Sequence, residues 1–250
     1  MQEHTLLHRE EAVLLLGKWT RDSLEDMLRK SSSYSTPGER ICYLSSLFLG
    51  TAYKEATLIG DVAVPEIFVI NLQEVDCFTF IDYIEAMRLS ASLHAFEKNL
   101  VKIRYRSGNV VFTARKHFFT DWSEFNKDFV DDVTECIGGR ETIRVCKQLN
   151  SREDGTSFLY GIQPLSRDIE YIPSSSLTDN LVDILETGDY IGIYSATPGL
   201  DVSHAGIFIR TGGAAYLRHA SSAKEQMKVI DQDFKSYIKT KPGIIVLRPK

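Results

Sequence analysis

The stretch Asp76-Cys77-Phe78-Thr79-Phe80 begins the segment around which the rest of the chain is organised. Aspartate is one of the preferred N-cap residues of helices. Behind it, Phe80, Ile84 and Met87 recur at the spacing of a helix with one apolar face. The sequence therefore predicts a helix that has Cys77 in its first turn and runs to about Ser90.

A cysteine in the first turn of a helix has a distinctive environment. Unpaired backbone N–H groups and the positive end of the helix dipole both favour the thiolate form of Cys77. Cys77 is therefore a candidate nucleophile, provided that a histidine reaches it from elsewhere in the fold. The alternative is that Cys77 is a small buried apolar residue, which is the usual place of a free cysteine.

The composition is that of an ordinary globular protein. The chain has 250 residues, of which 43% are hydrophobic and 25% charged, and its formal net charge is -5. A chain of this length can bury a full core without disulfides or metals. No run of lysine and arginine is present, so the sequence predicts no nucleic-acid partner.

No segment of the sequence is predicted to span a membrane. The apolar run Ala12 to Leu16 follows Arg9-Glu10-Glu11, and it is too short and too acidic on its N-terminal side for a signal peptide. The sequence therefore describes either a cytoplasmic protein or a mature form whose signal has been removed.

The order of the expected elements predicts an α+β fold. Helices are expected over 8–30, over 41–48 before Gly50, and from after Ser90 to about 104, with an extended stretch at 66–72. The later part of the chain alternates as strands do, at 143–147, 169–173, 190–194, 205–209, 214–217, 228–230 and 244–247. No linker divides the chain, so we expect one domain over 1–250, mainly helical over 1–106 and mainly strand over 107–250.

Four further segments lead to less regular expectations. Residues 110–112 are expected to form a short strand, and 116–122 either a loop that shapes a groove or a satellite core. Residues 174–186 are expected to form one amphipathic helix capped by a serine, and 232–239 another helix. Cys136 and Cys146 are interpreted as buried thiols, with a disulfide across a hairpin as the alternative.

Two histidines fall at the ends of neighbouring strands. His204 stands at the entry to an apolar strand, and His219 ends the next one. If Arg210 to Gly213 turns the chain into a hairpin, the two imidazoles lie side by side. His204 could then take the proton of the Cys77 thiol while His219 fixes its tautomer. The alternative is that both are ordinary strand-end residues.

A metal site is a further alternative for the same residues. Cys77, His204, His219 and Asp76 include the side-chain types that bind zinc. No cysteine lies in a C-x-x-C pair, however, and a common structural zinc site is not expected. The interpretation we carry forward has no metal and no cofactor.

The motifs, taken in order, resemble a known family. They are Asp76-Cys77, Thr187-Gly188-Asp189-Tyr190-Ile191, the stretch from Val202 to Phe208, and Leu217-Arg218-His219-Ala220-Ser221. They resemble the papain-like cysteine peptidases of the NlpC type, which cleave bacterial cell-wall peptides. Phe48-Leu49-Gly50-Thr51-Ala52-Tyr53 resembles the Gly-x-Pro-Tyr motif of that family, with Ala52 in place of proline. The strings are closer still to a branch described as N-acetylmuramoyl-L-alanine amidase-like.

The resemblance implies a papain-like fold, in which the nucleophile helix packs on a C-terminal antiparallel sheet. It also implies a Cys–His–His triad of Cys77, His204 and His219, with Tyr53 and Asp76 at the substrate groove. The implied substrate is peptidoglycan or a muropeptide, cleaved through an acyl-enzyme, and the implied location is periplasmic or exported. Two alternatives remain: a papain-like module that binds wall peptide without cutting it, and a zinc-dependent hydrolase that uses the same cluster.

Overall fold

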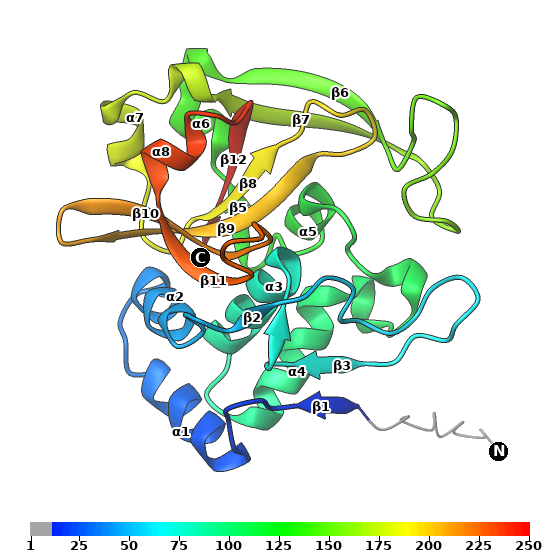
Figure 1. Ribbon diagram of the computed structural model, residues 1–250, viewed down its shortest axis with the longest axis vertical. Coiled ribbons are helices and arrows are strands. Elements are labelled where there is room, and N and C mark those ends of the chain that lie inside the picture. The colour runs from blue at the N-terminus through cyan, green and yellow to red at the C-terminus, as the bar shows by residue number, and fades with distance from the viewer. Residues whose placement is uncertain (1–11) are drawn as a thin grey trace.

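The fold is a mixed α+β structure built on a large, mostly antiparallel sheet (Figure 1). The computed structural model describes residues 12–250. The helices are α1 (Arg21–Ser31), α2 (Pro37–Ser46), α3 (Cys77–Arg88), α4 (Leu93–Arg104), α5 (Phe119–Glu124), α6 (Thr134–Gly138), α7 (Asp179–Ile184) and α8 (Phe234–Ile238). Across these residues, no helix has the length and apolar character that a membrane crossing requires.

The strands form two sheets. They are β1 (Val13–Leu15), β2 (Ala52–Tyr53), β3 (Val69–Asn71), β4 (Glu74–Val75), β5 (Val130–Asp132), β6 (Ile143–Leu149), β7 (Leu165–Pro173), β8 (Tyr190–Tyr194), β9 (Val202–Thr211), β10 (Ala214–Ser221), β11 (Lys228–Asp233) and β12 (Gly243–Pro249). The large sheet has the order β4-β2-β11-β10-β9-β8-β12-β7-β6, and β5 pairs with β12. Strands β1 and β3 form a small parallel sheet of their own.

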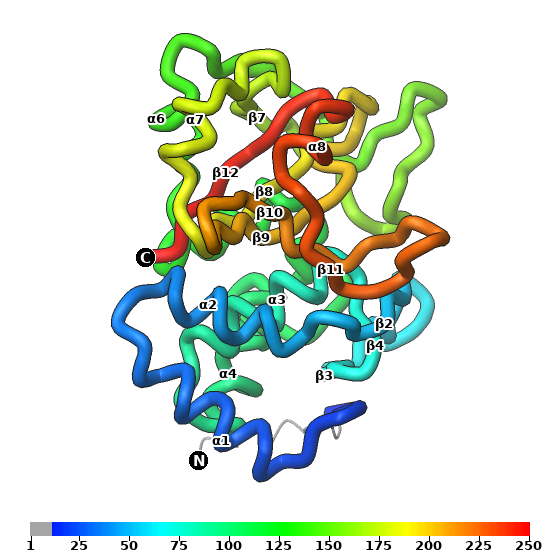
Figure 2. The backbone as a smooth tube through the Cα atoms, turned by 60° about the vertical axis from the view of Figure 1, so that its left-hand side comes forward, coloured from blue at the N-terminus to red at the C-terminus, as the bar shows by residue number. Residues whose placement is uncertain are grey.

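Helix α3 lies between the helical layer and the large sheet. Figure 2 shows α1, α2 and α4 on one side of it and strands β9 to β11 on the other. Its residues from Thr79 to Arg88 are all buried, although Asp82, Glu85 and Arg88 are charged. Asp82 pairs with Arg104 of α4 at 3.0 Å, and Glu85 pairs with Arg88 one turn on. These ion pairs make burial of the whole helix possible, because an unpaired buried charge is costly.

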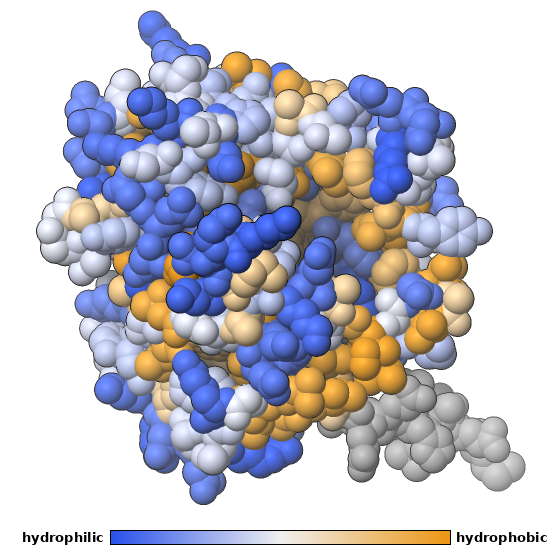
Figure 3. Space-filling model, viewed as in Figure 1, coloured by the Kyte–Doolittle hydropathy of each residue, from blue (hydrophilic) through white to orange (hydrophobic). Residues whose placement is uncertain are grey.

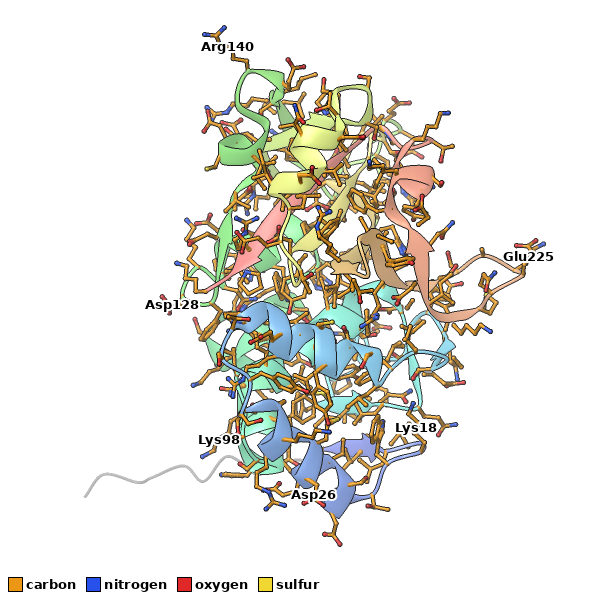
Figure 4. The ribbon with its side chains drawn as sticks, turned by 90° about the vertical axis from the view of Figure 1, so that its left-hand side faces the viewer. Lys18, Asp26, Lys98, Asp128, Arg140 and Glu225 are labelled. Carbon is orange, nitrogen blue, oxygen red and sulfur yellow. The ribbon has the colours of Figure 1, made fainter. Side chains whose placement is uncertain are left out.

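The other face of the sheet carries a second core. Apolar side chains of β8 to β10 and β12, among them Ile193, Phe208 and Leu217, pack there with α7 and α8. The side chains drawn in Figure 4 fill both cores, whereas the labelled charged residues, such as Arg140 and Glu225, point outward. Alternate residues of one strand therefore serve opposite faces, as a two-sided sheet requires.

Most of the expected elements are present. The helix predicted behind Asp76 is α3, and the one predicted from after Ser90 to about 104 is α4, which begins at Leu93. The predicted strands 143–147 and 169–173 lie within β6 and β7. The predicted turn between His204 and His219 joins β9 and β10, which pair as an antiparallel hairpin. The last predicted helix is the shorter α8.

Three predicted elements are wrong. Residues 13–15 form strand β1, not a helix, because they find a parallel partner in β3; residues 8–11 lie outside the described chain. Residues 110–112 form no strand and lead into a 3-10 turn at Phe112–Ala114. The single helix expected over 174–186 is a 3-10 turn at Ser174–Ser176 followed by the six-residue α7, which Thr178 caps in place of a serine.

Two further expectations need correction or refinement. Residues 116–122 do not form a separate satellite core: Phe119 and Trp122 of α5 are fully buried in the main core, and Trp122 donates to Asp82 at 2.9 Å. Cys136 and Cys146 are free thiols on exposed residues, not buried ones. Cys136 follows the first residues of the short α6, and Cys146 faces outward from β6, so neither side chain points into the core.

Candidate active site

The start of α3 is fixed by a complete capping box. One carboxylate oxygen of Asp76 accepts hydrogen bonds from the amides of Phe78 at 2.9 Å and Thr79 at 2.7 Å. In return the Thr79 hydroxyl accepts from the Asp76 amide at 3.0 Å. These contacts occupy three of the amides that a helix leaves unpaired at its start. The Cys77 amide is the one that this box leaves free.

The β9–β10 hairpin brings the two histidines together. His204 Nε2 lies 2.7 Å from His219 Nδ1, and the two rings are perpendicular. On its far side, His219 Nε2 lies 3.2 Å from the Gln232 side-chain oxygen on β11. The strands that carry His219 and Gln232 are neighbours in the sheet. The two imidazoles and the side-chain amide of Gln232 thus form one hydrogen-bonded chain.

Cys77 lies beside β9, the strand that carries His204. Its sulfur is in reach of the backbone amide of Ala205, the residue after His204. Tyr237 of α8 joins the same group: its ring centroid lies 5.1 Å from that of His219 and 6.4 Å from that of His204, and its pKa is raised by burial and by Cys77. The structure therefore pairs His204 with His219 and places Cys77 next to the strand that carries His204.

Burial controls the ionisation of this group. It raises the pKa of Cys77 to about 12, with the nearby Asp76 carboxylate acting in the same direction and the surrounding amides against it. Burial also lowers the pKa of His204 to about 3 and lowers that of His219. The thiol and both imidazoles are therefore neutral near pH 7. Burial therefore opposes the preference for the thiolate that the helix start provides, and it is the larger influence on this thiol.

Tyr53 and Asp76, the predicted groove residues, both lie close to the thiol. Tyr53 ends β2, which pairs with β4 immediately before the helix. The pKa of Tyr53 is raised first by its burial and then by Cys77. The Asp76 carboxylate serves as the helix cap. Its place beside Cys77 is as expected, and its hydrogen bonds account for it without a ligand.

Sequence reasoning missed Gln232 and Tyr237. Gln232 lies in β11 opposite Leu217 of the histidine-bearing strand, and Tyr237 follows in α8. Gln232 comes close to His219 because residues 228–233 pair with β10 in one particular register. The sequence has no signal that predicts this register across the loop between the two strands. His117, which lies outside this group, has its Nε2 2.8 Å from the carbonyl oxygen of Phe112, and burial lowers its pKa to about 4.

The face turned to the viewer in Figure 1 is hollowed. Figure 3 shows a recess there with apolar surface on its rim. The loop 222–227 between β10 and β11 stands out from the body nearby, with Glu225 at its tip (Figure 4). Within residues 12–250, no three His, Cys, Asp or Glu side chains are grouped so that they could hold a metal ion.

Solved structures similar to this chain include an N-acetylmuramoyl-L-alanine amidase from Bacteroides uniformis. It is 28% identical, with a TM-score of 0.71, and the match covers 86% of this chain and 100% of that one. Protein LPG0564 from Legionella pneumophila shares the fold at a TM-score of 0.77 and 20% identity, over 92% of this chain and 94% of that one. The comparison with curated proteins found no match.

A family model supplies the more specific assignment. The model of the AmiA-like family, described as N-acetylmuramoyl-L-alanine amidase-like, matches residues 43–244. That range holds α3, the β9–β10 hairpin and Gln232, and so includes every residue of the cluster described above. The chain belongs to the AmiA-like family of N-acetylmuramoyl-L-alanine amidase-like proteins.

Proposed function

We propose that this protein is a cysteine amidohydrolase that cleaves an amide bond in peptidoglycan, outside the cytoplasm. The observation that carries the proposal is the juxtaposition of Cys77, at a helix start, with the hydrogen-bonded pair His204 and His219. We further propose that residues 1–250 form one papain-like domain of the NlpC type, in which these three side chains act as nucleophile, base and orienting partner. The name of the family supports the choice of substrate.

The hydrogen-bonded chain assigns the tautomers. When the Gln232 oxygen accepts from His219 Nε2–H, His219 Nδ1 carries a lone pair and accepts from His204 Nε2–H. His204 Nδ1 is then unprotonated and can accept the thiol proton of Cys77. Gln232 acts in this scheme through His219 and is a positioning residue.

The reaction then follows the chemistry of a neutral dyad. As Cys77 Sγ attacks the amide carbonyl, its proton passes to His204, so that neither charge forms alone in the buried site. The free amide of Cys77 is placed to donate to the developing oxyanion, since Asp76 occupies the next two amides of the helix. His204 gives its proton to the leaving amine, which departs and leaves a thioester. Water, deprotonated by His204, hydrolyses the thioester and restores the thiol.

The test is hydrolysis of purified peptidoglycan by the wild-type protein and by Cys77→Ala. The products are separated by chromatography and identified by mass, so that a cut at the sugar–peptide junction is distinguished from a cut within the stem peptide. Cys146→Ala, which removes an exposed thiol of β6 outside the candidate site, is the matched control. We expect new amino groups with wild type and with Cys146→Ala and none with Cys77→Ala.

A binding module without catalysis is the competing function. It keeps the cluster and the recess but has no activated thiol. It predicts that wild type and Cys77→Ala bind muropeptide equally and that neither releases amino groups. Activity that persists in Cys77→Ala would instead exclude the cysteine mechanism.

A further inference from the structure

One lysine beside the histidine pair has no partner to satisfy its charge. Lys241 follows α8, is half-buried, and its Nζ lies 4.7 Å from the centroid of the Tyr237 ring. That ring is in turn the neighbour of His219 and His204. No carboxylate or hydrogen-bond acceptor of the chain from 12 to 250 engages the Lys241 ammonium.

The other buried or half-buried lysines have hydrogen-bond partners. Lys116 is buried, and its Nζ donates to the carbonyls of Lys102 and Phe125 and to the side chain of Asn126. Lys147, half-buried like Lys241, donates to three carbonyls at Ser195, Thr197 and Leu200. A half-buried ammonium that faces only an aromatic ring is therefore an exception in this protein, and such groups usually have a partner.

The charge of Lys241 also opposes protonation of His204, the proposed base. Its charge lowers the pKa of both His204 and His219, so the free protein holds a cation where the proposed reaction must protonate an imidazole. The other groups that face the pair are Cys77 and Tyr237, with Asp231 on β11 held by Arg218 at 2.7 Å. None of these neutralises Lys241. An anion that arrives with the substrate would do so.

We propose that Lys241 binds a carboxylate of the substrate, one or two residues away from the amide that Cys77 attacks. This inference rests on the proposed function and specifies its substrate class: an amide within a peptide that carries a free carboxylate near the scissile bond. The span fits, since one Tyr237 ring separates Lys241 from His219 and an extended peptide advances about 3.5 Å per residue. A free carboxylate and an ammonium then form a charge-assisted hydrogen bond.

The competing role for Lys241 is structural. In that role the ammonium only covers the Tyr237 ring, and a cation–π contact of that kind stabilises the fold without recognising a ligand. Such a role predicts that removing the charge weakens all ligands equally or none. Carboxylate recognition predicts that the loss depends on the carboxylate of the ligand.

The experiment measures binding by calorimetry in the Cys77→Ala protein, so that the outcome does not depend on turnover. The probes are a muramoyl dipeptide with free carboxylates and the same compound with its carboxyl groups amidated. We expect Lys241→Met to weaken binding of the free acid by about tenfold, with little effect on the amidated probe. Lys241→Arg should restore the preference for the acid. Lys239→Met, which removes an exposed lysine at the end of α8, should match the parent.

A second readout uses the protein that retains Cys77. Because Lys241 lowers the pKa of both histidines, Lys241→Met should move the acidic limb of kcat/KM to higher pH, which loss of packing alone would not do. Equal binding of both probes by the parent, or equal losses on both in Lys241→Met, would overturn the proposal. Absence of cleavage by the wild type would contradict the proposed function but leave the binding result to decide the role of Lys241.

Discussion

The ionisation of Cys77 gives the sharpest test of the dyad, through its rate of alkylation by iodoacetamide. With a pKa of about 12, the thiol is ionised in about one molecule in 10⁵ at pH 7, against a few per cent for an ordinary cysteine. A more basic thiolate is a better nucleophile, which recovers about half of that logarithmic gap. Without help, Cys77 should thus react about a hundredfold more slowly than an exposed thiol.

Help from His204 changes the pH dependence as well as the rate. If His204 accepts the proton during attack, the rate depends on neutral His204, whose pKa is about 3. We therefore expect the wild-type rate at Cys77 to be flat from about pH 5 to pH 8. In His204→Ala only the free thiolate can react. The alkylation rate at Cys77 should therefore be lower than in wild type, and it should increase tenfold with each pH unit.

Peptide mapping after alkylation provides internal references. Cys136 and Cys146 are exposed free thiols in the same molecule and should titrate as ordinary cysteines in every variant. His94→Ala, which changes an exposed histidine of α4, is the matched control and should behave as wild type. A wild-type Cys77 that is slow, rises tenfold per pH unit and is unchanged by His204→Ala would refute the dyad and favour the binding module.

Three further outcomes follow from local geometry. Asp76→Ala should lower the free energy of unfolding by about 1 kcal/mol in urea titrations, because the cap of α3 is lost, whereas Asp76→Asn should keep most of it; equal losses would argue against capping. Gly206→Ala should reduce kcat and cost about 1–3 kcal/mol of stability, since a Cβ there would lie 3.0 Å from that of His219; unchanged kinetics would show that the hairpin yields freely. Acid should destabilise the protein, because His117 has a folded pKa of about 4 against 6.5 when exposed. The contribution of neutral His117 to the free energy of unfolding is complete above pH 6.5 and decreases by about 3 kcal/mol as the pH drops to 4. In His117→Gln the free energy of unfolding should therefore decrease less between pH 7 and pH 4.

The elements that could be predicted are those whose signals are local. The cap at Asp76 and the apolar spacing behind it specify α3 within a dozen residues, and the glycines of the loop 210–213 specify the hairpin. Because a hairpin also brings neighbouring residues of its two strands close together, the proximity of His204 and His219, which lie diagonally across it, could be expected from the sequence. The central part of the candidate site was thus within reach of pattern reasoning.

The errors arise where contacts with distant parts of the chain determine the local structure. Strand β1 exists because residues 13–15 meet β3 more than fifty residues later, and a short apolar run by itself does not distinguish a strand from a helix. Gln232 and Tyr237 enter the site through the register of β11 and the placement of α8, neither of which has a local signal. The two alternatives for Cys77 could not be weighed for a related reason: the helix start is visible in the sequence, while burial depends on the whole fold.

Burial links the proposed mechanism to the proposed role of Lys241. A thiol and an imidazole that are both neutral in the free protein cannot exchange a proton cheaply, since the resulting charges would form in a desolvated site beside an existing cation. A substrate carboxylate on Lys241 removes the repulsion between that cation and the forming imidazolium. Proton transfer from Cys77 to His204 then becomes easier only when the correct ligand is bound. In that scheme the unpartnered lysine makes the nucleophile dependent on the substrate, and an amide that lacks the carboxylate loses kcat as well as affinity.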